Sequence, residues 1–250
     1  MNRPIGILGG MGPEATVDLM TRVIAAVDAD DDADHIPLIV HQNSQVPSRI
    51  AALVEGRGED PAPVLETMAQ DLARAGAVAL AMPCNTAHHY APAIRAATDL
   101  PFLDMVELAC ARAAELAPDG QVGVLGSPAL ATIGVYDRAL SARGLKALHV
   151  PDGEAALDLI RRIKADGASE ETAREIRALA DTLIARDAGA ICVACTEFSL
   201  MTDALGGLSV PVFDSLDLLV DAIVAASISN DATGDCPPDR GTVRVGAAAG

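Results

Sequence analysis

Residues 77–86 read AVALAMPCNT and residues 190–197 read AICVACTE, so in each an apolar run leads into a cysteine followed by polar side chains. Continuous apolar runs that alternate with helical patterns are typical of buried parallel sheet covered by helices on both faces. Residues 62–74 and 170–188 have the apolar spacing of helices with one buried face. The sequence therefore predicts an α/β fold. Further apolar runs expected as strands lie at 5–10, 35–40, 101–105, 122–127 and 210–214.

The same design occurs twice along the chain. Three landmarks recur in one order: IGILGG (5–10) with VGVLGS (122–127), the segment around Cys84 with that around Cys195, and Asp104 with Asp214. A shared order and a cysteine at equivalent places indicate two related halves rather than a common composition. We expect two pseudo-symmetric Rossmann-like domains with parallel sheets and an active site in the cleft between them.

The repeat also suggests where the domains divide. The N-terminal α/β half is expected at 1–105, joined by a helix at 214–228, and the C-terminal α/β half at 106–213. Residues 229–250 are rich in Gly, Pro and Asp with little apolar periodicity, which predicts a flexible tail.

Composition limits the kinds of partner. Half of the 250 residues are hydrophobic but only 2% are aromatic, so the core is expected to be aliphatic. A net charge of -17 disfavours nucleic acid and anionic membranes as partners, and it is typical of a solvated surface. An anionic ligand would therefore need a local positive site.

The chain is expected to be a cytoplasmic protein. Its first twenty residues lack the pattern of a signal peptide, and the best candidate membrane segment, 216–228, is short and broken by Asp217 and Asp221. The five cysteines are then reduced thiols rather than a disulfide framework. Their spacing predicts no zinc site, because the CxxC of Cys192 and Cys195 has no second ligand pair nearby.

Cys84 and Cys195 both follow buried strands and precede polar residues. Ligands of open parallel sheets bind beyond the carboxyl ends of strands, where free N–H groups at a helix start favour a thiolate. Two such thiols in related halves would face each other across a cleft. One could remove a proton from a carbon acid while the other delivers a proton to the opposite face. Cys110 and Cys192, among apolar neighbours, are expected to be structural, and Cys236 in the tail to be a bystander.

The sequence resembles the aspartate/glutamate racemase superfamily, and most closely its aspartate racemase branch. The resemblance spans about residues 4–225 and implies two pseudo-symmetric α/β domains, no cofactor, no metal, a two-cysteine mechanism and a homodimer. The motifs that carry it are GILGGMGPEAT (6–16), MPCNTAHHY (82–90), PFLDM (101–105), the Gly-Val-Leu start at 123 with Tyr136, IRRIKADG (160–167) and ACTEFSL (194–200).

The same resemblance assigns roles to individual residues. Cys84 and Cys195 match the catalytic thiols, and Arg49 and Lys164 match the basic pair that grips the side-chain carboxylate of the substrate. The remaining substrate-binding residues that it predicts are Asn85, Thr86 and Thr196 at the α-carboxylate, Met11 and Gly12 in the loop that lines the pocket, and Ser127 and Glu197. The predicted activity is cofactor-independent racemisation of a dicarboxylic amino acid, aspartate before glutamate.

Other functions stay open at this point. A decarboxylase of a malonate-type acid or a cis-trans isomerase of a diacid could use the same fold, although decarboxylase relatives keep only one of the two thiols. A non-catalytic binder of a small diacid is a third hypothesis. His88 and His89 could suggest a Cys-His nucleophile, but we expect one of them to cap or pack a helix and the other to face solvent.

Overall fold

Two four-stranded parallel sheets form the framework of the computed structural model, which describes residues 2–118 and 120–229. The first sheet has the order β2-β1-β3-β4 and the second the order β6-β5-β7-β8, so each strand has its counterpart at the same place. This confirms the predicted α/β fold with two similar parallel sheets. The predicted tail beyond residue 229, with Cys236, lies outside the described residues. The strands are β1 (Ile5–Gly9), β2 (Leu38–Gln42), β3 (Ala79–Ala81), β4 (Phe102–Leu103), β5 (Gln121–Gly126), β6 (Lys146–His149), β7 (Ala188–Ala194) and β8 (Val212–Asp214).

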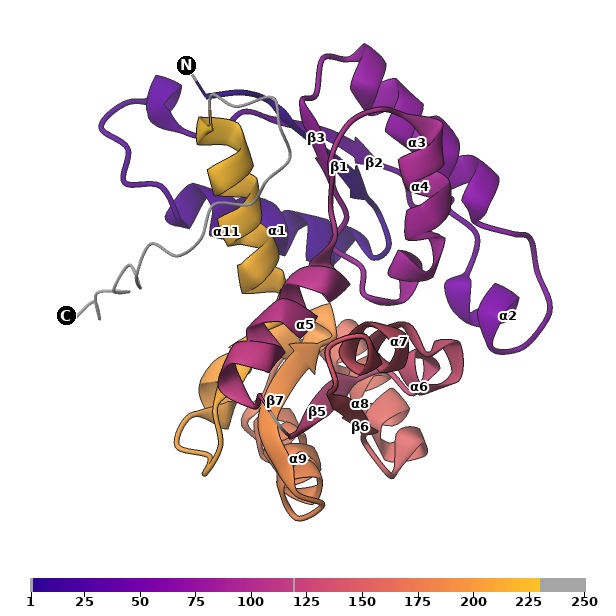
Figure 1. Cartoon of the computed structure of the whole chain (residues 1–250), viewed down its shortest axis with the longest axis vertical. Helices are drawn as coiled ribbons and strands as arrows, with labels where there is room; N and C mark the ends of the chain where they lie inside the picture. Colours follow the sequence, from indigo (N-terminus) through magenta and orange to yellow (C-terminus); the bar gives the residue numbers. More distant parts are fainter. Residues whose placement is uncertain (1, 119, 230–250) are drawn as a thin grey trace.

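Helices cover both sheets (Figure 1). The predicted helix at 62–74 is confirmed as α3, which buries Leu65, Met68 and Leu72 on one face. The other helices are α1 (Pro13–Ala25), α2 (Arg49–Leu53), α4 (Ala91–Ala97), α5 (Met105–Leu116), α6 (Ala129–Ile133), α7 (Val135–Ser141), α8 (Gly153–Asp166), α9 (Glu170–Ile184), α10 (Thr196–Ser199) and α11 (Ser215–Ile228), with 3₁₀ turns η1 (Asp32–Asp34), η2 (Thr86–Tyr90) and η3 (Thr202–Leu205). No helix among the described residues is long and apolar enough to cross a membrane.

One expectation about an element was wrong, and one strand was not predicted. The predicted helix at 170–188 ends at Ile184, because the chain turns through Asp187 at a positive φ of 67° and enters β7 at Ala188. Strand β6 was not anticipated. It pairs with β5 alone at the edge of its sheet, and it is only partly buried. An exposed edge strand lacks the continuous apolar run that marks the central strands.

Two helices cross from one half of the molecule to the other. Helix α5 follows the first sheet, yet Val106, Ala109 and Cys110 lie in the core of the second half. Helix α11 follows the second sheet, yet its buried face packs with Ile5 and Ile7 in the core of the first half. Figure 1 shows α11 in yellow beside α1, among the indigo and purple elements of the N-terminal half. This exchange supports the proposed division, in which the helix at 214–228 completes the N-terminal half.

The start of each crossing helix is capped by an aspartate, Asp104 directly after β4 and Asp214 as the last residue of β8. Asp104 accepts hydrogen bonds from the backbone N–H groups of Val106 and Glu107, and Asp214 accepts one from Leu216. Each carboxylate also binds an arginine, Arg95 at 2.8 Å and Arg22 at 3.0 Å respectively. The matched aspartates of the sequence repeat are therefore helix caps at the junction of the halves.

Candidate active site

Cys195 occupies the single residue between β7 and α10. The residue is only 8% exposed, and its Sγ donates a hydrogen bond to Oε2 of Glu197 at 2.8 Å. Burial, together with the negative charge of Glu197, raises the pKa of this thiol well above its ordinary value. Backbone N–H groups of Glu197 and Phe198 act in the opposite direction but are outweighed. The expectation that the helix start favours a thiolate is therefore wrong for Cys195 in the free protein.

Glu197 lies between the thiol and a lysine. Its Oε1 pairs with Nζ of Lys164 on α8 at 3.0 Å, and its Oε2 also accepts from the hydroxyl of Thr196 at 3.5 Å. Burial acts to raise the pKa of Glu197, but the hydrogen bond from Cys195 and the charge of Lys164 outweigh burial and lower the pKa below its ordinary 4.5. Cys195 is therefore held as a neutral thiol beside an ionised carboxylate.

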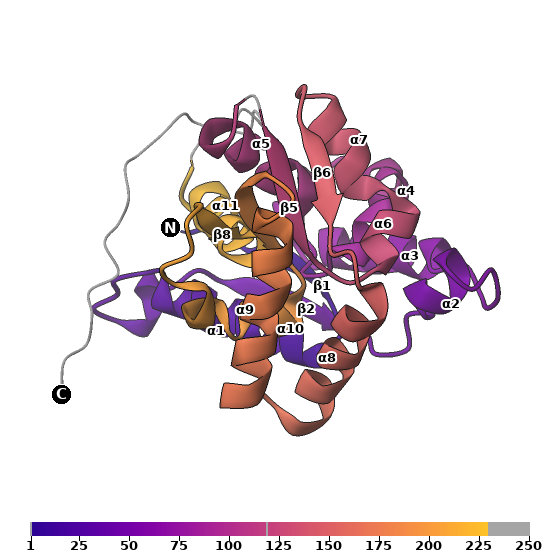
Figure 2. The same ribbon diagram turned by 90° about the horizontal axis from the view of Figure 1, so that it is seen from below.

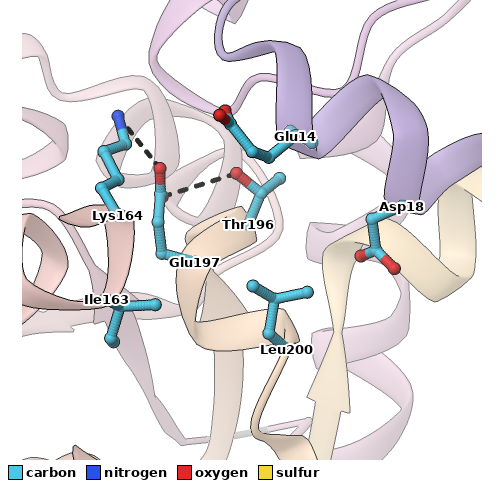
Figure 3. A pocket seen from close by; sticks show the side chains of 8 residues that line it. Glu14, Asp18, Ile163, Lys164, Thr196, Glu197 and Leu200 are labelled. Atoms are coloured by element: carbon cyan, nitrogen blue, oxygen red, sulfur yellow. Dashed lines mark hydrogen bonds and ion pairs between the residues drawn. The ribbon is translucent and has the colours of Figure 1, made fainter. Parts of the chain in front are cut away.

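A small cavity of about 60 Å³ opens beside this chain of groups (Figure 3). Lys164 and Thr196 reach the Glu197 carboxylate from different sides, and Glu14 of α1 faces it from the other half of the molecule. In Figure 2, α8, α10 and α1 come together on one side of the sheets. The cavity thus lies where the two halves meet. Its lining residues are Glu14, Ala15, Asp18, Ile163, Lys164, Thr196, Glu197 and Leu200.

Cys84 lies three residues beyond β3, the counterpart of β7. It is 9% exposed and belongs to the same apolar cluster as Met11 and Val46. Its carbonyl accepts a hydrogen bond from Nδ1 of His88 at 2.8 Å, while Nε2 of His88 accepts the N–H of Met105 at 3.1 Å. Both ring nitrogens therefore bind backbone, so His88 is not available as a base for the thiol.

The histidine pair behaves as the packing interpretation predicted. His88 is buried, and burial lowers its pKa although Asp104 acts to raise it. His89 is exposed. A Cys-His nucleophile is therefore excluded for this pair.

Arg49 begins α2, behind the Ser48 cap. Its guanidinium donates to the carbonyl of Pro47 at 3.1 Å and to that of Met11 at 3.4 Å, while its Nε is buried without a partner. This places Arg49 beside the loop that contains the predicted Met11 and Gly12.

The structure also places the other candidates. Thr86 is half-buried at the start of η2, and the hydroxyl of Ser127, just after β5, accepts the N–H of Ala129 at 3.3 Å. Cys110 and Cys192 are buried, and burial raises the pKa of Cys110 to about 12 and that of Cys192 well above its ordinary value. No cluster of metal-ligating side chains occurs in the described part of the chain.

The sequence model of the Asp/Glu/Hydantoin racemase family matches residues 8–223. The chain belongs to this family. The resemblance found in the sequence motifs is thereby confirmed, and membership makes the chain an isomerase of the amino-acid racemase type. Neither a decarboxylase nor a cis-trans isomerase is favoured by the comparisons.

Known relatives are similar to this racemase over most of its length. The broad specificity amino-acid racemase RacX of Bacillus subtilis is 27% identical over 233 residues, which cover 90% of this chain and 98% of RacX. The Picrophilus torridus aspartate racemase superposes with a TM-score of 0.75 at 25% identity, covering 90% of this chain and 94% of that one. A glutamate racemase from Francisella tularensis, solved with D-glutamate, shares the fold at a TM-score of 0.61 and 16% identity, covering 90% of this chain and 80% of that one.

One network in this racemase was not foreseen from its sequence. The hydroxyl of Tyr136 donates to Oδ1 of Asn85 at 2.6 Å, and Nδ2 of Asn85 donates to the hydroxyl of Ser215 at 3.3 Å. The side chain of Asn85, expected at the substrate carboxylate, is thus used here to join elements of both halves. Tyr136 stands in a family motif, but nothing in the sequence pointed to Ser215.

Proposed function

We propose that this chain is a cofactor-independent racemase of an acidic amino acid, aspartate before glutamate, in which Cys84 and Cys195 work on opposite faces of the substrate. The observation that carries the proposal is the position of Lys164. Its Nζ lies 3.0 Å from the Glu197 carboxylate that accepts the S–H of Cys195, and it lines a cavity to which α1 of the other half also contributes. A cation at a cavity where the two halves meet supports a single site shared by the two cysteines, one from each half.

The proposed reaction needs two proton carriers. One sulfur, as thiolate, takes the proton from Cα, and the thiol on the other face gives its proton to the resulting carbanion. Backbone N–H groups at the starts of η2 and α10 would stabilise the negative charge that develops on the substrate carboxylate. The two thiols follow equivalent strands, β3 and β7, so the pseudo-symmetry of the fold supports equivalent roles.

Substrate recognition is proposed to use one cation from each half. Arg49 from the N-terminal half and Lys164 from the C-terminal half would bind the side-chain carboxylate, as charge-assisted hydrogen bonds favour. A negatively charged substrate needs such local cations, because the chain as a whole carries a net charge of -17 and would otherwise repel it. The other proposed substrate contacts are Met11, Gly12, Asn85, Thr86, Ser127, Thr196 and Glu197.

Proton exchange at Cα tests the proposal directly. L-Asp, D-Asp, L-Glu and D-Glu are each incubated with the protein in heavy water without added cofactor, and Cα–H loss and chirality are followed by NMR. Cys84→Ala and Cys195→Ala should each abolish racemisation, whereas Cys110→Ala should retain it as a matched thiol control. Full activity in either of the first two variants would end the two-thiol mechanism. The homodimer is part of the proposal, and sedimentation of the purified chain tests it.

A further inference from the structure

Arg22 of α1 binds four groups at the junction of the two halves. Its Nη1 donates to Oδ2 of Asp214 at 3.0 Å and to Oδ1 of Asp217 at 2.5 Å, and its Nη2 donates to the carbonyl of Ser199 at 2.8 Å. Its Nε donates to Oδ2 of Asp18 at 3.1 Å. One guanidinium thus joins α1 to the end of α10, to the end of β8 and to α11.

We propose that Arg22 is a positioning residue that holds Cys195, and the wall of the cavity that α10 forms, against the wall that α1 forms. Asp18 of α1 and Leu200, directly after Ser199, both line that cavity (Figure 3). The guanidinium therefore binds a lining residue of one wall and the backbone next to a lining residue of the other. The consequence for catalysis rests on the proposed function, whereas the placement of the thiol does not.

Ser199 carries the contact from Arg22 to the thiol segment. It lies four residues after Cys195 and is only 3% exposed. Its backbone N–H donates to the carbonyl of Cys195 at 3.0 Å, and its hydroxyl lies 3.3 Å from the same carbonyl oxygen. That hydroxyl donates to Oδ1 of Asp214 at 2.9 Å. The backbone of Cys195 is therefore connected to the two groups that Arg22 holds, the carbonyl of Ser199 and the carboxylate of Asp214.

The segment of the other thiol is tied to its crossing helix in an equivalent way. His88 lies four residues after Cys84, whose carbonyl it binds, and accepts the N–H of Met105 at the start of α5. Arg95 pairs with Asp104, the cap of that helix, at 2.8 Å. Within residues 2–118 and 120–229, however, Arg95 donates to no backbone carbonyl. Arg95 is thus a matched control, an arginine paired with a cap aspartate but without a contact to a thiol segment.

The burial of Asp214 makes the loss of Arg22 costly. The side chain of Asp214 is 2% exposed, and burial is the main cause that raises its pKa to about 6. The charge of Asp217 adds to this effect, while the N–H of Leu216 and the charge of Arg22 oppose it. The carboxylate is therefore ionised at neutral pH although it is buried. Removing its cation leaves an uncompensated buried charge, so we expect the surrounding segment to rearrange.

Alkylation of the thiols by iodoacetamide tests the positioning without any substrate. Cys195 is buried and hydrogen-bonded in the wild type, so it should react slowly. In Arg22→Gln its modification, followed by peptide mass spectrometry, should become faster by about tenfold or more, the factor that one charge-assisted hydrogen bond is worth. The rate at Cys84 should stay at the wild-type value. Arg95→Gln should leave the rate at Cys195 unchanged.

The other thiols show whether a variant is still folded. Cys110 and Cys192 are buried, so rapid modification of both would mean that the chain has unfolded. Ser199→Ala removes the hydroxyl next to the Cys195 carbonyl and keeps the guanidinium. It should also accelerate modification of Cys195, and it decides the question if Arg22→Gln unfolds.

Steady-state kinetics of racemisation give a second readout. Arg22→Gln should lower kcat by about 10–10²-fold, because a displaced catalytic group reacts more slowly. KM should change little, since the guanidinium binds protein groups rather than the substrate. Arg22→Lys keeps the charge but has a single nitrogen, so it should recover only part of kcat. A KM that rises at constant kcat would assign Arg22 to substrate binding and would overturn the inference.

Failure of this inference is distinct from failure of the proposed function. Wild-type rates of Cys195 modification in both Arg22→Gln and Ser199→Ala would end the positioning role, whatever the activity. Racemisation that survives in Cys195→Ala would instead remove the two-thiol mechanism, and the modification rates would still decide whether Arg22 positions the thiol.

Discussion

Replacing Tyr136 with phenylalanine removes one hydroxyl from the junction between the two halves. Tyr136 is 1% exposed, and burial raises its pKa well above the ordinary 10, so its hydroxyl is a neutral donor. It donates to Oδ1 of Asn85 at 2.6 Å, and Asn85 is itself only 5% exposed. In Tyr136→Phe that oxygen remains buried without this donor. An unsatisfied buried acceptor costs about 1–3 kcal/mol, which for a chain of this size corresponds to a Tm lower by about 2–12 °C.

Urea unfolding followed by circular dichroism measures this loss. The other tyrosine in the chain provides the control, because Tyr90 is also buried but its hydroxyl makes no hydrogen bond within the described residues. Tyr90→Phe should change the unfolding free energy by less than about 0.5 kcal/mol. A double-mutant cycle with Asn85→Ala should give a coupling of about 1 kcal/mol. Equal stability of the two Tyr→Phe variants, or zero coupling with Asn85, would refute the assignment of this hydrogen bond as a link between the halves.

Three other perturbations test the packing and the charges. Leu219 of α11 is 0% exposed in the core of the N-terminal half. Leu219→Ala should lower the free energy of unfolding in urea by about 2–5 kcal/mol. A negligible decrease would contradict the role of α11 in that core. Gly10→Ala should lower stability in a thermal melt by about 1–3 kcal/mol or more, because φ is +94° and a Cβ would lie 2.4 Å from the carbonyl carbon of Asn43. The folded-state pKa of Glu197 lies below 4.5, so its charge stabilises the fold above that pH and the stabilisation is lost as pH falls through the folded value. The urea midpoints of Glu197→Gln and the wild type should therefore converge in acid. A difference between the two midpoints that stays constant with pH would exclude a link between the ionisation of Glu197 and the stability of the fold.

Most of the fold could be predicted from apolar runs. Buried central strands such as β1, β5 and β7 consist of continuous apolar residues, so their positions are evident from local sequence. The edge strand β6 was missed because it is only partly buried and its sequence, KALH, carries no such run. The end of α9 was placed four residues too late because the turn at Asp187 uses a positive φ at a residue other than glycine.

The candidate site could be predicted only in part. The two cysteine motifs were found from their pattern and from the resemblance, and Lys164 from the resemblance alone; the structure places Nζ of Lys164 3.0 Å from Glu197, the hydrogen-bond partner of Cys195. The network of Tyr136, Asn85 and Ser215 could not be found, because its members come from three separate segments that meet only through tertiary packing.

The sequence alone determined the repeated α/β design and the family, because hydrophobic pattern and motif order are properties of the linear chain. Tertiary structure decided the ionisation of the site. A helix start next to Cys195 favours a thiolate in isolation, yet burial and the carboxylate of Glu197 hold the sulfur protonated. Desolvation and Coulomb energy depend on which groups surround an atom in space. For Cys195 those groups include Lys164, brought to Glu197 from another helix, so only the folded molecule could reveal them.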